Sequence, residues 1–149
     1  MAQLVATRKN FEHAFKKHYE CYKTFPQDAH KRSKRLLLVY AVENGLKCLL
    51  LKKICKQDSD DLRRHSGCRK CMGDDGHDIK EMLKWLGTGG QFHIKNFKVG
   101  SVDVQNVEPH LLHQFWRYGL ETEDISAEED VEQTLFQIVD WVCRSLDLR

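Results

Sequence analysis

Apolar residues recur with the period of an α-helix along most of this chain. The first such segment covers residues 2–25 and ends at Pro26. Its aromatic side chains follow one another at spacings of four, four and three, which places them on one helical face: Phe11, Phe15, Tyr19 and Tyr22. The spacing predicts an amphipathic helix with one buried side.

The second segment, residues 30–56, is the most apolar in the chain. An inner stripe is widened by further apolar side chains on both flanks, so that most of the circumference is apolar: Leu38, Val42, Leu46 and Leu49, flanked by Leu37, Tyr40, Ala41 and Leu50. A helix that is apolar over so much of its surface is usually surrounded by other elements. The pattern therefore predicts a central helix.

Three more helices are predicted in the second half of the chain. One begins near His77 and ends at Gly87, and another opens at Pro109. The last begins at Ser126, because Glu129 stands three positions further on and completes a capping-box pattern. A buried stripe then continues to the C-terminal end of this helix.

Two stretches lack helical periodicity. Residues 57–76 are polar and predict a long loop that carries two cysteines. Residues 91–107 predict a small β-hairpin with a tight turn at Gly100 and Ser101, between β-branched residues. We therefore expect one all-α domain over residues 1–149, an up-down four- or five-helix bundle with a β-hairpin insertion near 91–107.

Composition narrows the class of protein. No apolar run approaches the roughly 20 residues needed to cross a bilayer, and the first residues lack the apolar stretch of a secretory signal. The six cysteines are scattered, so without an export signal we expect thiols rather than a disulfide framework. These observations predict a cytoplasmic protein without a membrane partner.

The formal net charge of +2 conceals a division between the two halves of the chain. Residues 1–72 carry 17 Lys and Arg against 7 Asp and Glu, whereas residues 73–149 carry 7 against 15. Such an asymmetry is typical of a surface that binds nucleic acid. It is equally typical of two halves that pair with each other, or with a second copy of the chain.

Three patches, in this order, resemble the HEPN family (higher eukaryotes and prokaryotes nucleotide-binding). The first is YAVENGLKCLLLKK, residues 40–53, which is similar to the second helix of that family. The second runs from Gly76 through His77, Asp78 and Ile79 and is similar to the start of its third helix. The third is RYG, residues 117–119, in place of the Arg-Tyr-Pro turn of the family.

This resemblance implies a helical bundle that binds a nucleotide, RNA or a partner nucleotidyltransferase or effector, within a microbial defence or toxin–antitoxin system. Many HEPN proteins are metal-independent ribonucleases that use an Arg-x4–6-His motif in their last long helix. Here that spacing occurs only from Arg8 to His13, in the first predicted helix, and no histidine follows Arg117. We therefore expect a binding subunit, with little or no catalytic activity and no cofactor.

The residues expected to hold phosphate are cationic or aromatic. The resemblance implies this role for Arg117 and Tyr118, since a guanidinium binds phosphate with two hydrogen bonds and a ring stacks on a base. Lys47 is a further candidate, although Glu43, four residues earlier, offers it a helix salt bridge instead. The basic run at the start of the second helix is either a phosphate contact or a solvated edge: Lys31, Arg32, Lys34 and Arg35.

Two alternative sites stay open from the sequence alone. His113 and Arg117 are four residues apart and share a helical face, so they could form a relocated ribonuclease site with residues of a second subunit. Arg117 could equally cap its helix and pair with Glu121 or Glu123.

The other alternative is a zinc-organised interaction module. Its candidate ligands have the spacing His-x2-Cys-x2-Cys-x5-His, and imidazole and thiolate are good zinc ligands: His65, Cys68, Cys71 and His77. All four lie within 13 residues, whereas structural zinc sites usually combine two separated pairs. A flexible loop with two exposed thiols is therefore the competing interpretation. We also expect a homodimer, because Phe115 and Trp116 offer aromatic surface for a second copy.

Overall fold

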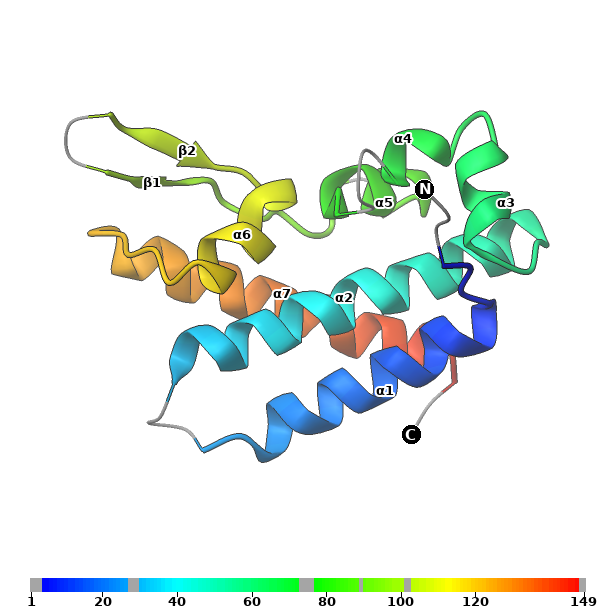
Figure 1. Ribbon diagram of the computed structural model, residues 1–149, viewed down its shortest axis with the longest axis horizontal. Coiled ribbons are helices and arrows are strands. Elements are labelled where there is room, and N and C mark those ends of the chain that lie inside the picture. The colour runs from blue at the N-terminus through cyan, green and yellow to red at the C-terminus, as the bar shows by residue number, and fades with distance from the viewer. Residues whose placement is uncertain (1–3, 27–29, 73–76, 89, 101–102, 148–149) are drawn as a thin grey trace.

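The computed structural model describes residues 4–26, 30–72, 77–88, 90–100 and 103–147. Three long helices form its core, α1 (Arg8–Thr24), α2 (Lys31–Ile54) and α7 (Ile125–Ser145). In Figure 1, α2 and α7 run in the same direction, and α1 runs back along α2 in the opposite one. The remaining elements lie on the other side of α2 from α1. The predicted all-α bundle with a small hairpin is confirmed.

The second helix is the centre of the core, as its apolar pattern predicts. Half of its residues are buried, among them Leu38, Val42 and Leu46, which have no exposed surface. Gly45 lies where α2 packs against both of the other long helices. A Cβ there would stand 2.8 Å from Phe15 on α1 and 2.8 Å from Val142 on α7, closer than carbon atoms pack.

Backbone hydrogen bonds join the start of α1 to the segment that follows α2. Thr7 caps α1 and forms an isolated antiparallel bridge with Asp58. On either side of this bridge, the amide of Arg8 donates to the carbonyl of Gln57, and the amide of Ser59 donates to the carbonyl of Ala6, both at 2.8 Å. The helical hairpin of α1 and α2 is thus closed at both ends.

The stretch predicted as a polar loop contains two short helices, so that prediction is wrong for its described part. These are α3 (Ser59–Arg64) and α4 (Arg69–Met72). Asp58 caps α3 through a hydrogen bond from the amide of Asp61, whose carboxylate accepts from the amide of Asp58 in return. A helix of this length shows no sustained apolar period, which is why the pattern gave no sign of it. Residues 73–76 lie outside the described structure.

The next predicted helix is present as α5 (Ile79–Trp85). Asp78 caps it by accepting a hydrogen bond from the amide of Glu81. The chain leaves the helix at Gly87, which has φ +74°, a left-handed conformation that glycine adopts without strain. The expected stop at Gly87 is therefore confirmed.

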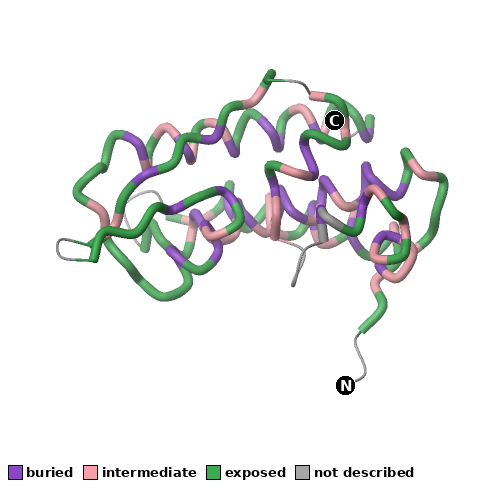
Figure 2. Tube along the Cα trace, turned by 90° about the horizontal axis from the view of Figure 1, so that it is seen from above, coloured by how far each residue is buried: buried purple, intermediate pink, exposed green. Residues whose placement is uncertain are grey.

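The predicted hairpin is also present, but its turn is longer than expected. Strands β1 (Phe97–Val99) and β2 (Gln105–Val107) pair antiparallel, with Phe97 opposite Val107 and Val99 opposite Gln105. Five residues therefore separate the strands, so the prediction of a two-residue turn at Gly100 and Ser101 is wrong. Residues 101–102 themselves lie outside the described structure. Figure 2 shows the hairpin as mostly exposed, with buried positions concentrated on the inner faces of the helices.

A short 3₁₀ turn, η1 (Pro109–Leu111), leads into α6 (Leu112–Arg117). This agrees with a helix opened by Pro109. The expected cap of the last helix is wrong, because Asp124 rather than Ser126 accepts the capping hydrogen bond, from the amide of Ala127.

The aromatic residues assigned to a dimer surface lie inside the chain. Phe115 and Trp116 are each 2% exposed, and the ring centroid of Phe115 lies 4.9 Å from that of Phe97 on the hairpin. Burial within one chain removes the argument that these residues cover a second copy. Among the described residues, no helix is long and apolar enough to cross a membrane.

Candidate functional site

Three polar residues from separate parts of the chain meet beside the middle of α2. Glu43 comes from α2, His77 precedes the cap of α5, and His113 comes from α6. Glu43 is 3% exposed and His113 is 4% exposed. We call these three residues the imidazole cluster. A buried carboxylate is costly unless it is paired, so its partner is the first question.

His77 is the partner of Glu43. Its Nδ1 lies 3.0 Å from both carboxylate oxygens of Glu43, and about a quarter of its side chain is exposed. A neutral imidazole that donates from Nδ1 keeps its lone pair on Nε2. The pair therefore has the arrangement of a base held in one tautomer by a carboxylate.

The ring of His77 also stacks on the ring of His113. Their centroids are 3.6 Å apart and the planes are inclined by 16°. Two protonated imidazoles at this distance repel each other, whereas the single carboxylate of Glu43 can neutralise one positive charge.

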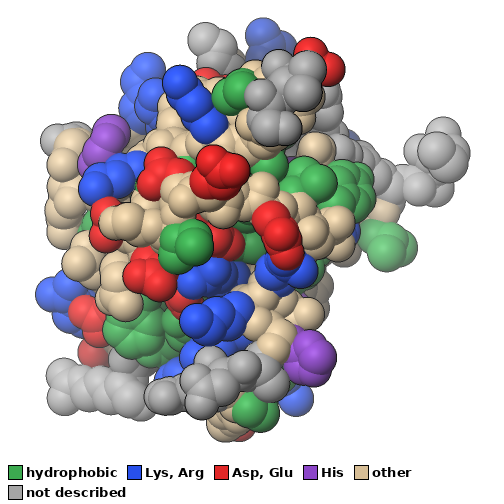
Figure 3. Space-filling view, turned by 90° about the vertical axis from the view of Figure 1, so that its left-hand side faces the viewer, with side chains coloured by type: hydrophobic (Ala, Val, Ile, Leu, Met, Phe, Trp, Pro, Cys, Tyr) green, Lys and Arg blue, Asp and Glu red, His purple; other side chains and the backbone are tan. Residues whose placement is uncertain are grey.

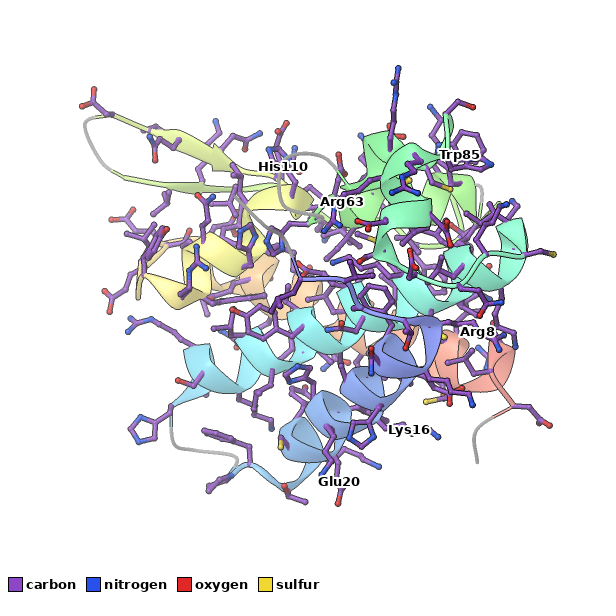
Figure 4. All side chains as sticks on the ribbon, turned by 45° about the vertical axis from the view of Figure 1, so that its right-hand side comes forward. Arg8, Lys16, Glu20, Arg63, Trp85 and His110 are labelled. Carbon is purple, nitrogen blue, oxygen red and sulfur yellow. The ribbon has the colours of Figure 1, made fainter. Side chains whose placement is uncertain are left out.

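Two basic groups border Glu43. Burial lowers the pKa of Lys47, Glu43 opposes that effect, and Arg63 adds to it. Burial also lowers the pKa of His18, again against the influence of Glu43. Figure 4 labels Arg63, which extends from α3 toward the middle of the molecule. The carboxylate of Glu43 is therefore close enough to influence two basic side chains, Lys47 and His18.

Arg117 and Tyr118 lie at the exposed end of α6, one helical turn beyond His113. The guanidinium donates to the hydroxyl of Tyr118 at 3.1 Å and lies 5.0 Å from the centroid of that ring. The hydrogen bond to Tyr118 raises the pKa of Arg117, with a smaller contribution from Tyr40 on α2. Among the ion pairs of the described residues, none involves Arg117.

The arginines of the basic run have carboxylate partners within the chain. Arg35 is 7% exposed and lies between Glu128, at 2.8 Å, and Glu132, at 2.9 Å. Arg32 pairs with Glu121. Figure 3 shows this end of the molecule, where basic and acidic side chains alternate over the surface. At this end, the basic half of the sequence therefore meets the acidic half in the same chain.

The lysines of the run have different surroundings. Lys34 places its ammonium 4.9 Å from the centroid of the Tyr22 ring. Lys31 is exposed and lines a surface cavity of about 510 Å³ between the starts of α2 and α7. Arg32, Arg35 and Arg117 line the same cavity.

The four residues considered as zinc ligands do not form a site. Cys68 and Cys71 have no exposed surface, and burial raises the pKa of both thiols, that of Cys71 to about 12. The Nδ1 of His65 accepts hydrogen bonds from the amides of Gly67 and Cys68, while His77 faces Glu43. The expectation of a flexible loop with exposed thiols is likewise wrong, although all six cysteines are free.

Sequence reasoning named each member of the imidazole cluster but did not bring the three together. Glu43 and His77 belong to two of the patches that resemble HEPN proteins, and His113 lies four residues before the third. The signal that could have joined them was a carboxylate within the most apolar segment, which needs a buried partner from elsewhere.

A comparison of the chain with known protein families, with curated proteins and with solved structures gave no match.

Proposed function

We propose that this protein is a HEPN-like binding subunit that holds the phosphate groups of a nucleotide or of RNA at the end of α6. One observation carries the proposal. Arg117 is exposed and makes no ion pair among the described residues, whereas Arg32 and Arg35, which line the same cavity, are each engaged by a carboxylate. An arginine without a carboxylate partner keeps its donors available for a phosphate.

The neighbours of Arg117 suit the rest of a nucleotide. Tyr118 is 62% exposed, and an exposed ring provides a platform on which a base can stack. The hydrogen bond between Arg117 and Tyr118 fixes the two groups relative to each other. Lys31, exposed in the same cavity, adds a second cation for the neighbouring phosphate. The third patch of the resemblance, residues 117–119, contains Arg117 and Tyr118 and supports the same assignment.

The test is binding of a short single-stranded RNA, measured by fluorescence anisotropy at one fixed salt concentration. We expect Arg117→Ala to weaken binding about tenfold or more, since a hydrogen bond to a charged group contributes about 1.5–3 kcal/mol. Arg32→Ala is the matched control, because Arg32 lies in the same cavity but already binds Glu121. Equal losses in both variants, or no binding by the natural protein, would contradict the proposal.

A partner nucleotidyltransferase or effector is the other ligand that the resemblance implies. Native mass spectrometry of the protein isolated from its own cells separates the two. A mass increase that matches a nucleotide or RNA supports phosphate binding, and one that matches a second polypeptide supports the partner.

The imidazole cluster favours one second candidate, metal-independent cleavage of RNA. The supporting observation is the pair of Glu43 and His77, in which a partly exposed imidazole is held by a carboxylate 3.0 Å away. His113 is too buried to reach a substrate and would act by supporting His77. Arg117 would then stabilise the negative charge of the transition state.

Cleavage of RNA in the presence of EDTA tests this candidate. General acid–base catalysis contributes roughly 10²–10⁴-fold, so His77→Ala should reduce cleavage by about that factor. His113→Ala and Arg117→Ala should also reduce it. Cleavage that persists unchanged in His77→Ala would rule out this assignment.

A further inference from the structure

The imidazole cluster brings together the donor atoms that a transition metal requires. One atom each from Glu43, His77 and His113 lies within 4.8 Å of the other two. No other group of three or more His, Cys, Asp or Glu residues in the described part of the chain meets this condition. We propose that these three side chains bind one divalent transition-metal ion, with Zn²⁺ as the best-suited metal.

The ligand types fit this metal. Two imidazoles with one carboxylate make up the ligand set of a common class of zinc enzymes, in which a fourth position stays open. Imidazole nitrogen favours Zn²⁺, Cu²⁺ or Ni²⁺, whereas Mg²⁺ and Ca²⁺ prefer oxygen. Glu43 supplies only one negative charge, so a bound Zn²⁺ leaves a net charge of +1 in the cluster when both rings are neutral.

Two of the three residues are buried and fixed in position, whereas the third is partly exposed and leaves a way in for an ion. Glu43 and His113 come from the packed helices α2 and α6 and are nearly inaccessible. His77 is about a quarter exposed and lies outside a helix, between residues 73–76 and the cap of α5. An ion can therefore reach the cluster from the side of His77 and finds the other two ligands held in place.

Binding requires one rearrangement. Ligand atoms around a tetrahedral zinc lie roughly 3.3 Å apart, because each is about 2.0–2.1 Å from the ion. The pair of Glu43 and His77 already has this separation, at 3.0 Å. The lone pairs of two nearly parallel rings cannot meet at one point, so the stack of His77 on His113 has to open. The exposed ring, His77, is the one free to tilt.

The inference is independent of the proposed function. Phosphate binding is assigned to Arg117 and is tested with RNA, whereas the ion is tested with the metal alone. The general-base role of His77 and coordination by His77 exclude each other in one molecule. Added Zn²⁺ would therefore inhibit metal-independent cleavage, if the protein shows it.

The experiment is a titration with Co²⁺, which substitutes for zinc and absorbs visible light when its coordination is tetrahedral. The starting protein carries Cys21→Ser and Cys55→Ser, because these two thiols are exposed and could bind cobalt themselves. We expect one Co²⁺ per chain, visible d–d bands without thiolate-to-cobalt charge transfer, and full displacement by one equivalent of Zn²⁺.

Variants locate the ion. His77→Gln should weaken Co²⁺ binding by more than about 100-fold, since even groups that only support a metal ligand contribute 10–100-fold. Glu43→Gln should do the same. His110→Gln is the matched control, because His110 is an exposed histidine on η1 that pairs with Glu108. Figure 4 shows His110 on the same side of α2 as α6.

Folding is checked by circular dichroism before each titration. If Glu43→Gln fails to fold, His77→Gln decides alone, because the side chain of His77 is partly exposed. Three results would overturn the proposal: no tetrahedral spectrum in the starting protein, a charge-transfer band that places cobalt on a cysteine, or unchanged affinity in His77→Gln.

Discussion

Two regions of this protein contain the residue types that bind metals. The fold buries the thiols of one region in the apolar core, whereas it brings the polar side chains of the other region together. The segment from His65 to Cys71 has its candidate ligands close together in the sequence, yet its two thiols lie in the apolar core. The imidazole cluster draws its members from positions 43, 77 and 113, and they meet within hydrogen-bonding or stacking distance. Closeness in sequence was therefore a poor guide to closeness in space.

The reason lies in the polarity of the groups. A neutral thiol behaves as a small apolar side chain, so Cys68 and Cys71 gain by leaving water. A carboxylate cannot be buried without a partner, so the position of Glu43 inside the bundle requires a donor beside it. His77, which precedes the cap of α5, meets that requirement.

The largest expected difference between the regions concerns thiol reactivity. In the native protein, Cys21 and Cys55 should react rapidly with an alkylating or disulfide reagent, because both are exposed. Cys68 and Cys71 should react at least about 1,000-fold more slowly, since a buried thiol becomes accessible mainly when the protein opens. Mass spectrometry of the labelled peptides at several times gives both rates. Rapid labelling of Cys68 would show that this segment is not packed as described.

The second largest effect should come from removing the carboxylate of the imidazole cluster, which lowers the free energy of unfolding. Glu43→Ala leaves a cavity and removes the acceptor of the Nδ1–H of His77, and a hydrogen bond to a charged group contributes about 1.5–3 kcal/mol. Because the side chain of His77 is partly exposed, we expect about 2–3 kcal/mol, measured as the free energy of unfolding in urea. The control is Glu12→Ala on α1, whose ion pair with Lys16 is exposed and should contribute less than about 0.5 kcal/mol.

A polar replacement in the cysteine segment should have an intermediate effect. Cys71→Ser buries a hydroxyl where no surface is exposed, and such a group costs about 1–3 kcal/mol when it has no hydrogen-bond partner. Cys71→Ala should be milder, because it adds no polar atom. If the two variants are equally stable in urea, the surroundings of Cys71 are more polar than the burial indicates.

Replacing Lys47, which adjoins the imidazole cluster, should change the free energy of unfolding least. Burial lowers the pKa of Lys47 in the folded state, so the unfolded chain binds more protons at alkaline pH. Stability should therefore rise with pH in the window just below the ordinary lysine value, and Lys47→Met should abolish that rise. The same variant should be more stable near neutral pH by less than about 1 kcal/mol. A loss of stability in Lys47→Met would mean that its attraction to Glu43 outweighs its burial.

Much of the fold could be predicted from apolar spacing. The period identified α1, α2 and α7, and Gly87 marked the end of α5. The pattern missed α3, whose six residues are too few to repeat a period, and it placed the cap of α7 at Ser126 instead of Asp124. Capping depends on backbone angles at one residue, and several residues near a helix start can adopt them.

The candidate site could be predicted only in parts. Arg117 and His113 were recognised from their spacing on one helix, and Glu43 and His77 from patches of the resemblance. Their meeting depends on how α5 and α6 pack against α2, which no local pattern specifies. The ion pairs of Arg32 and Arg35 could not be predicted either, because their carboxylate partners lie some 90 residues away in the sequence.

The bridge between Thr7 and Asp58 has a consequence for how the chain is assembled during synthesis. The hairpin of α1 and α2, with its two ends joined, can close as soon as the residues up to about 60 have left the ribosome. At that moment Glu43 is already in place, but His77 and His113 have not yet left the ribosome. The carboxylate therefore stays open to water on the nascent chain until the later segments cover it. The imidazole cluster is completed only when α6 docks, which makes it a marker of that step of folding.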